Sequence, residues 1–254
     1  MIAVDIGNTK TSLGLFQGQE LIRSWRFRTE KKRLADEFFT QLRMYLAQVG
    51  VHLEDQDGVC ISSVVPELTG EIRGYDLGAP LHFVSHQSPI DFHIKLPSPQ
   101  SLGPDIICVS QACIELYDCP IVMIDAGTAT TVMAINENKE FIGGAICPGL
   151  GISSQALFKA ASALSAVTLT VPPKAIGQDT ESAVQSGLCR GHAAMIEGLA
   201  QSFRTELGRQ DAQVVMTGGA IRSLKDLMPS DYVYRPDLAL QGLRSIFSKL
   251  YEQI

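Results

Sequence analysis

The sequence predicts an α/β fold built from two similar halves, and two observations support this prediction. The chain opens with MIAVDIGNTKTSLGLF and later carries IVMIDAGTATTVMAI, so a short apolar run ending in Asp and followed by Gly and Thr occurs twice. In each half the expected strands come first and the expected helices follow, which is typical of α/β units. We therefore predict a first domain over residues 1–117 and a second over residues 118–254.

The length of the chain limits the number of domains, and its charge limits the kinds of partner that are expected. The 254 residues suffice for one large domain or two small ones, at about 100–200 residues each. The formal net charge is −6 and the main basic run is EKKR, whereas duplex nucleic acid needs clustered cations to neutralise its phosphates. We therefore expect no nucleic-acid partner. A bound nucleotide remains possible, because backbone amides and a metal can hold its charge.

Apolar stretches and cysteines indicate a cytoplasmic protein without a membrane partner. No apolar stretch reaches the roughly 18 residues that span a bilayer, and Asp5 already stands in the first strand, so no signal peptide is expected. The six cysteines show neither a CxxC pair nor zinc-finger spacing. We expect them to be buried free thiols.

Local patterns predict the elements of the first half. Apolar, β-branched residues on both sides of DIGNTKT predict strand, turn and strand, and apolar residues at helical spacing predict a helix over residues 34–49. Four prolines and Gly103 within residues 88–104 predict a loop. The predicted elements are strands over residues 1–16, a strand near 21–27, the helix over 34–49, a strand over 58–66, a short helix over 69–78, a strand over 80–85 and a helix over 105–117.

The second half repeats this pattern from residue 120. Its opening PIVMIDAGTATTVMAIN again predicts strand, turn and strand, and QVVMTGG predicts a strand that enters a glycine turn. The predicted elements are strands over 120–136, a strand over 140–146, a helix over 153–164, one long helix or a bent pair over 182–207, the strand and turn over 213–219, and a helix over 239–253.

The repeated phrase suits phosphate and metal chemistry. A strand holds its terminal carboxylate in place, the glycine allows close approach of a phosphate, and the following residues present N–H and hydroxyl donors. Two such turns facing one cleft would bracket a nucleoside triphosphate, with Asp5 and Asp125 binding Mg²⁺ directly or through water. A single copy is equally typical of a strand-end turn with a capping Asp. The turn at Gly218 and Gly219 fits the adenosine side or an ordinary strand-to-helix turn.

Eight short phrases extend the pattern along nearly the whole chain: DIGNT, SSVVP, GPD, DAGTATT, GGAICPG, IGQDT, SGL and TGG. In this order they resemble the type III pantothenate kinases, a family within the acetate and sugar kinase, Hsp70 and actin superfamily. The resemblance implies two ribonuclease H-like halves with a nucleotide cleft between them. It also implies a cytoplasmic homodimer that phosphorylates pantothenate with ATP, the first step of coenzyme A biosynthesis, using Mg²⁺ and a monovalent cation, K⁺ or NH₄⁺.

The resemblance assigns roles one residue at a time. Asp105, in GPD, matches the general base for the substrate hydroxyl, although it also suits a helix N-cap. Asp125 and Asp5 match metal ligands, and Thr180 matches a residue that reaches the pantothenate site across the dimer. Expected ATP and phosphate contacts are Asp5, Gly7, Asn8, Thr9, Lys10, Gly127, Thr128, Thr130, Thr131, Gly218 and Gly219. Expected substrate contacts are Leu96, Gly103, Pro104, Asp105, Ile106 and Thr180.

Two residues depart from the family's pattern on the acceptor side. The family writes GxDR where this chain has GPDI, so Ile106 replaces an Arg, and Leu96 stands where the family usually has Tyr. Arginine supplies five donors and a fixed charge, and isoleucine supplies none. Either another cation, such as Arg73, Lys95 or Arg190, serves pantothenate, or the acceptor has changed. A regulatory role like that of the Bvg accessory factor and a module that holds nucleotide only as structure are further alternatives.

Overall fold

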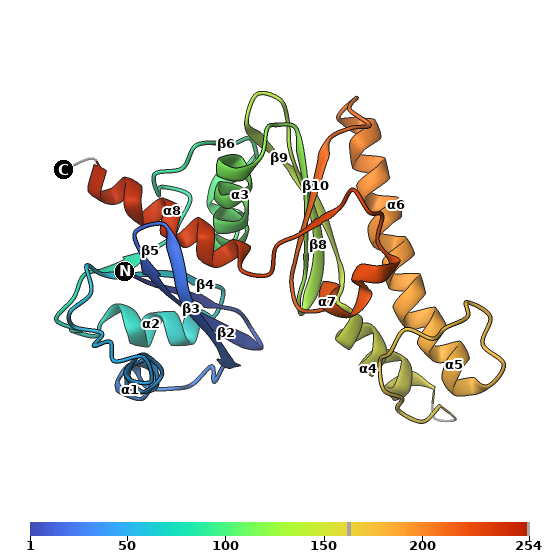
Figure 1. Cartoon of the computed structure of the whole chain (residues 1–254), viewed down its shortest axis with the longest axis horizontal. Helices are drawn as coiled ribbons and strands as arrows, with labels where there is room; N and C mark the ends of the chain where they lie inside the picture. Colours follow the sequence, from blue (N-terminus) through green and yellow to red (C-terminus); the bar gives the residue numbers. More distant parts are fainter. Residues whose placement is uncertain (162–163, 253–254) are drawn as a thin grey trace. The chain divides into compact units, whose positions relative to one another are not determined.

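The computed structural model describes residues 1–161 and 164–252 and divides into two compact units (Figure 1). The first unit holds Met1–Glu115 together with the C-terminal segment from Asp237, and the second holds Leu116–Pro236. The sequence predicts a division into residues 1–117 and 118–254. The structure differs at the C-terminus, because the last helix packs on strands of the first unit.

The first unit is built on a mixed sheet of order β3-β2-β1-β4-β5. The central strand β1 is antiparallel to β2 and parallel to β4, while β3 continues the antiparallel side and β5 the parallel side. The strands are β1 (Ile2–Ile6), β2 (Lys10–Gln17), β3 (Glu20–Arg28), β4 (Val59–Ser63) and β5 (Leu81–Phe83).

The second unit repeats this topology. Its strands follow the order β11-β10-β7-β8-β9, in which β7 is antiparallel to β8 and parallel to β10. The same sequence of antiparallel and parallel neighbours therefore surrounds β1 and β7, which confirms the prediction of an α/β fold with two similar halves. The strands are β7 (Ile121–Ala126), β8 (Ala129–Ile135), β9 (Glu140–Pro148), β10 (Gln213–Thr217) and β11 (Val233–Tyr234).

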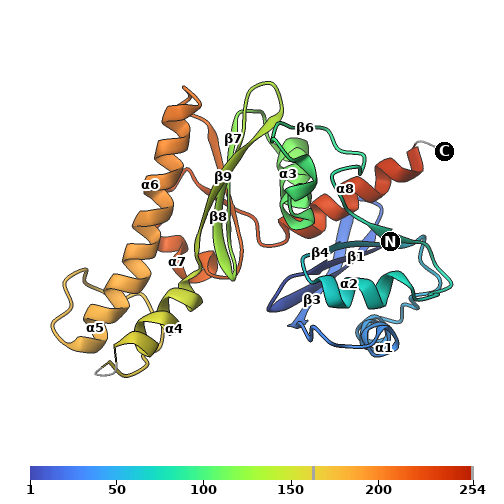
Figure 2. The same cartoon turned by 180° about the vertical axis from the view of Figure 1, so that it is seen from behind.

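Helices cover both faces of the first sheet. Helices α1 (Ala35–Ala47) and α2 (Pro66–Arg73) pack on the face that carries the side chains of Ile2, Val4 and Ile6. Helices α3 (Pro104–Leu116) and α8 (Leu238–Glu252) lie on the opposite face (Figure 2). The predicted apolar stripe of the first helix is its buried face, formed by Phe38, Phe39, Leu42 and Leu46 with Tyr45 partly buried.

In the second unit, one helix dominates the covered face of the sheet. Helix α6 (Gly191–Glu206) packs Ala193, Ile196 and Ala200 against strand residues such as Ile124 and Val132 (Figure 1). The predicted helix or bent pair over 182–207 consists of α5 (Thr180–Gln185), the π-helical segment η2 (Ser186–Arg190) and α6.

Several boundaries differ from the predictions. Helix α2 begins at Pro66, because proline is well suited to the first helical position. The helix predicted over 153–164 is α4 (Leu150–Ala160), and residues 162, 163 and 253 of predicted helices lie outside the described residues. Short elements without a strong periodic signal were not predicted: β6 (His93–Ile94), η1 (Pro99–Ser101), α7 (Ile221–Leu224), η3 (Lys225–Leu227) and β11.

The predicted buried free thiols are found at four of the six cysteines. All six cysteines are free, and Cys60, Cys108, Cys113 and Cys189 are buried while Cys119 and Cys147 are half-buried. Within residues 1–161 and 164–252, each helix is too short or too polar to cross a bilayer.

Candidate functional site

The first repeated turn connects β1 to β2. Gly7 N–H donates to the Lys10 carbonyl oxygen at 3.0 Å, and a Cβ on Gly7 would lie 3.0 Å from that same oxygen. The turn thus favours glycine at this position. Asn8, Thr9 and Lys10 are exposed, so the predicted phosphate-binding residues of this turn are accessible.

Asp5 stands at the end of β1 on the sheet face opposite the α1 and α2 core. Its Cα is paired with Ser12 on β2 and with Ser62 on β4. Directly paired residues of neighbouring strands point to the same face, so a hydroxyl-bearing residue flanks the half-buried aspartate on each side. The sequence reasoning missed Ser12 and Ser62, because their relation to Asp5 depends on strand register.

A cation also lies beside this turn. Lys31 Nζ donates to Asn8 Oδ1 at 2.9 Å. Lys31 belongs to the EKKR run, which the sequence marks only as a basic run too short for a duplex-binding surface. It brings a positive charge to the turn from the connection between β3 and α1.

The second turn connects β7 to β8 and has the same flanking pattern. Asp125 is half-buried, and its Cα is paired with Thr131 on β8 and Thr217 on β10. Gly127 N–H donates to the Ala129 carbonyl oxygen at 2.9 Å, and Gly127 and Thr128 are exposed. Each half therefore presents a carboxylate between two hydroxyl-bearing neighbours next to an accessible glycine turn.

Two glycines from other connections pack directly on the second turn. A Cβ on Gly149 would overlap the Thr128 carbonyl and come within 2.6 Å of the Gly127 oxygen. Gly218 has φ +95°, and its Cβ would lie 2.5 Å from the Ala126 oxygen, while Ala220 N–H donates to that oxygen at 3.0 Å. The structure thus brings the predicted adenosine turn against the predicted phosphate turn, with Gly219 open to solvent. Gly149, in the phrase GGAICPG, was not predicted.

The prediction for Thr130 needs correction. Thr130 is wholly buried and its Oγ1 lies 2.9 Å from His192 Nε2. Side chains alternate between the faces of a strand, and Asp125 is paired with Thr131. Thr130 therefore points to the α6 side, away from the carboxylate, and its hydroxyl is not presented to a ligand. Thr131 is half-buried on the face of Asp125.

Asp105 lies in the first turn of α3. The helix starts at Pro104, with Ile107 N–H bonded to the Gly103 oxygen, so Asp105 is inside the helix rather than at its cap. Its Oδ1 accepts from Ile106 N–H at 2.9 Å. A Cβ on Gly103 would overlap that carboxylate oxygen, so glycine leaves room for it. Burial raises the pKa of Asp105 above its ordinary value, and the backbone hydrogen bonds of Ile106 and Asp105 oppose the rise.

Asp5 and Asp105 share surroundings within the first unit. Cys108 lies one helical turn beyond Asp105 and is wholly buried. Burial raises the pKa of its thiol well above the ordinary value, and the proximity of Cys60, Asp5 and Asp105 raises it further. The two aspartates therefore lie near one buried thiol. Burial likewise raises the pKa of Cys60 to about 12, so both thiols stay protonated.

The remaining predicted substrate residues are spread over both units. Leu96 and Ile106 are half-buried in the first unit, and Ile106 directly follows Asp105. Thr180 is exposed at the start of α5 in the second unit, directly after the capping residue Asp179. It lines an apolar hollow of about 450 Å³.

Two of the alternative cations are engaged elsewhere. The Arg73 guanidinium lies 4.2 Å from the centre of the Phe83 ring. Arg190 Nη2 donates to the Pro172 oxygen at 2.8 Å. Both guanidinium groups are thus held by other partners within their own units.

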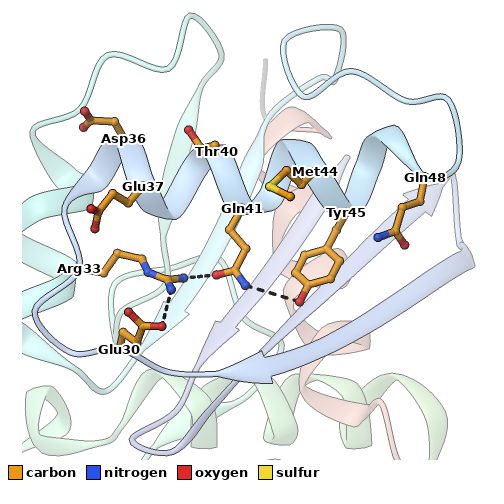
Figure 3. A pocket seen from close by; sticks show the side chains of 9 residues that line it. All are labelled: Glu30, Arg33, Asp36, Glu37, Thr40, Gln41, Met44, Tyr45 and Gln48. Carbon is orange, nitrogen blue, oxygen red and sulfur yellow. Dashed lines mark hydrogen bonds and ion pairs between the residues drawn. The ribbon is translucent and has the colours of Figure 1, made fainter.

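A hollow of about 590 Å³ lies on α1, apart from these residues (Figure 3). Within it Arg33 donates to Gln41 and Glu30, and Gln41 donates to the Tyr45 hydroxyl (Figure 3). Four of its polar side chains thus bond one another. The lining residues are Glu30, Arg33, Asp36, Glu37, Thr40, Gln41, Met44, Tyr45 and Gln48.

Each glycine turn offers a carboxylate of the type that magnesium uses together with a substrate. Over residues 1–161 and 164–252, the side chains of His, Cys, Asp and Glu form no group of three that could hold a metal by itself. Mg²⁺ is usually bound by one or two carboxylates together with waters and substrate phosphates. Asp5 in the first unit and Asp125 in the second each offer one such carboxylate, at a strand end beside a glycine turn.

The fold defines the class of protein. Solved structures with the same fold include an archaeal actin homolog, Ta0583 (TM-score 0.52, 14% identity, 98% of this chain and 100% of that chain). They also include the activator of the 2-hydroxyisocaproyl-CoA dehydratase from Clostridium difficile with bound ADPNP (TM-score 0.54, 11% identity, 100% and 97%). A conserved putative Baf family transcriptional activator from Campylobacter jejuni is also similar (TM-score 0.66, 18% identity, 99% and 100%). This is the actin-like ATPase fold.

Sequence relatives identify the family. The family described as type III pantothenate kinase matches residues 1–202. The type III pantothenate kinase of Thermomicrobium roseum is 36% identical over 100% of this chain and 99% of its own length. That of Roseiflexus castenholzii is 40% identical over 97% and 98%. The chain belongs to the type III pantothenate kinase family.

Proposed function

We propose that this chain transfers a phosphoryl group from ATP to the primary hydroxyl of pantothenate, in the first step of coenzyme A biosynthesis. Membership of a kinase family supports the reaction class. The observation that carries the residue assignment is the pair of half-buried carboxylates, Asp5 and Asp105, beside Cys108 in the first unit. Asp5 stands at a turn of the phosphate-binding type, and Asp105 stands at the start of a helix. We therefore assign Asp5 to the phosphate and Asp105 to the acceptor hydroxyl.

For phosphoryl transfer, the protein mainly has to position the reacting groups and stabilise the developing charge. The N–H groups and side chains of the turns at Gly7 and Gly127 hold phosphate oxygens, and Gly219 offers bare backbone to adenosine. Asp105 accepts the proton of the acceptor hydroxyl. Asp5 and Asp125 hold Mg²⁺, which when bound neutralises phosphate charge.

The finer features of the proposal follow the family resemblance. They are a homodimer in which Thr180 reaches the partner's pantothenate site, a monovalent cation at the phosphates, and a cytoplasmic location. The exposed position of Thr180 on the second unit supports the first of these. Size-exclusion chromatography with light scattering, and assays in K⁺, NH₄⁺ and Na⁺ buffers, test the dimer and the cation.

A coupled ADP-release assay with and without pantothenate tests the function. ADP release that depends on pantothenate is the expected result. ATP binding without pantothenate-dependent release would instead favour an altered acceptor or a regulatory protein, as the replacement of the family's Arg by Ile106 allows. If neither ATP nor ADP raises the melting temperature, the nucleotide assignment itself fails.

Activity should decline on the acid side at a higher pH than an ordinary aspartate would cause. The base must be ionised to accept a proton, and burial raises the pKa of Asp105. As the pH falls, Asp105 therefore becomes protonated earlier, and kcat/KM for pantothenate falls with it. The pH profile of kcat/KM measures this limb. An acid limb at or below the ordinary aspartate pKa would contradict the assignment.

The substitution Ile106→Arg should move that limb to lower pH. A guanidinium beside Asp105 favours the ionised carboxylate and lowers its pKa. If the missing cation also limits pantothenate binding, the variant lowers KM for pantothenate as well. Ile106→Met is the matched control, because it keeps an apolar side chain of similar length. An acid limb that is the same in the Arg and Met variants would show that residue 106 does not face Asp105.

A further inference from the structure

The buried contact between Thr130 and His192 lies next to the second phosphate turn. Thr130 Oγ1 and His192 Nε2 are 2.9 Å apart, and both side chains are buried, at 0% and 6% exposure. Burial lowers the pKa of His192, so its ring is neutral at neutral pH and one ring nitrogen can accept a hydrogen bond. The pair is a built-in polar contact inside an otherwise apolar interface between β8 and α6.

Thr130 is connected to the turn through a rigid peptide. The Ala129 carbonyl, which accepts the Gly127 N–H and closes the turn, belongs to the peptide plane that ends at Thr130. Because that plane is stiff, fixing the side chain and backbone of Thr130 also fixes the orientation of this carbonyl. The contact with His192 therefore acts on the turn without touching its ligand.

The π-helical segment η2 sets the direction of His192. It ends at Arg190, and α6 starts at Gly191, so His192 is the second residue of α6. A π segment contains an extra residue relative to an α-helix, and one residue of register turns a side chain by roughly 100°. With this register, His192 joins Cys189, Ala193 and Ile196 on the buried face of the helix.

The first unit has an equivalent buried contact, formed by a different pair of residues. Thr11 follows the first turn in the position that Thr130 has after the second, since Thr11 is paired with Ile6 and Thr130 with Ala126. Thr11 is also wholly buried, and its Oγ1 lies 2.9 Å from Thr29 Oγ1. A buried threonine hydroxyl with a partner from another element thus follows both turns.

We propose that His192 is a positioning residue for ATP binding, which holds the turn at Gly127 and Thr128 in place through the hydroxyl of Thr130. This inference rests on the proposed function, in which that turn binds phosphate. His192 does not touch the nucleotide. Its contact with Thr130 raises the affinity for ATP, and the use of pantothenate at saturating ATP does not depend on it.

The test compares ATP affinity, measured by calorimetry on the full chain, in Thr130→Val and His192→Leu. Each variant loses one hydrogen bond, worth about tenfold in affinity, so Kd for ATP should rise about tenfold. At saturating ATP, kcat/KM for pantothenate should stay within about twofold. The double variant should bind ATP no worse than the weaker single variant, because both remove the same contact.

Rescue and control variants separate positioning from general stability. His192→Gln should restore ATP affinity, because its amide reaches the place of Nε2, whereas the shorter His192→Asn should not. Asn136 lies beyond the far end of β8 and bonds Glu140 within its own turn. Asn136→Ala should lower the melting temperature and leave Kd for ATP unchanged.

The outcomes distinguish this inference from the proposed function. Unchanged ATP affinity in both Thr130→Val and His192→Leu, with weakened affinity in Asp125→Asn, would overturn the inference alone. Unchanged affinity in all three would overturn the assignment of the second turn to ATP as well. Thr130→Val keeps the shape of the side chain, so the test stands even if His192→Leu does not fold.

Discussion

Asp105→Asn should lower turnover with pantothenate by about 10²–10⁴-fold, the usual contribution of a positioned general base. The amide keeps an oxygen that can accept the Ile106 N–H, so the start of α3 should be preserved. It cannot take the proton of the acceptor hydroxyl. We propose that ATP binds through other residues, so its affinity, measured by calorimetry, should change by less than about twofold.

The stability of this variant provides an internal check. A carboxylate whose pKa is raised in the folded state costs stability at pH values above its unfolded pKa, and this cost is relieved as the pH falls. Asn carries no charge, so Asp105→Asn should be at least as stable as the parent chain at neutral pH. Asp118→Asn, an exposed acid beyond the far end of α3, is the control and should keep full turnover. Turnover of Asp105→Asn within tenfold of the parent would remove Asp105 as the base.

Gly149→Ala should weaken ATP binding by at least about tenfold and destabilise the chain by about 1–3 kcal/mol, the usual cost of overpacking. The added methyl group would overlap the Thr128 carbonyl and crowd the Gly127 oxygen. Both are backbone atoms of the turn at Gly127 and Thr128, and they cannot move aside as a flexible side chain does. The turn itself must shift, and its donors shift with it.

Gly151→Ala is the matched control for this substitution. Gly151 lies two residues later, inside α4, and nothing stands within 4 Å of an added Cβ. Alanine is a better helix former than glycine by roughly 0.8–1.0 kcal/mol, so this variant should be slightly more stable and bind ATP normally. Thermal melting of both variants measures the change in stability, and calorimetry with ATP measures the change in affinity. Equal ATP affinity in Gly149→Ala and Gly151→Ala would show that the turn does not bind phosphate.

Much of the architecture could be read from local pattern. The apolar runs around Asp5 and Asp125 predicted both strand–turn–strand units, and the stripe from Phe38 to Leu46 predicted the buried face of α1. These signals are local because a strand or helix repeats its environment every two or 3.6 residues. The family resemblance then supplied the proposed roles of residues such as Asp105, which periodicity alone could not.

Tertiary structure decided which face each site residue occupies. The first turn places four residues between Ile6 and its partner Thr11, and the second places three between Ala126 and Thr130. A change of one residue in register moves every following side chain to the other face of its strand. For this reason Thr130 faces His192 rather than the phosphate side, although the two phrases look alike in the sequence.

Other parts of the site depend on segments that are far apart in the chain. Ser62 and Thr217 flank the two aspartates only because parallel strands from later in the sequence pair with β1 and β7. Gly149 must lack a side chain only because another connection passes against it, and α8 belongs with the first unit only through its packing. By itself, the sequence determined the strands, the helices and the residue types of the two turns, since these arise from neighbouring residues. The partners of those turns were decided by contacts that exist only once the chain has folded.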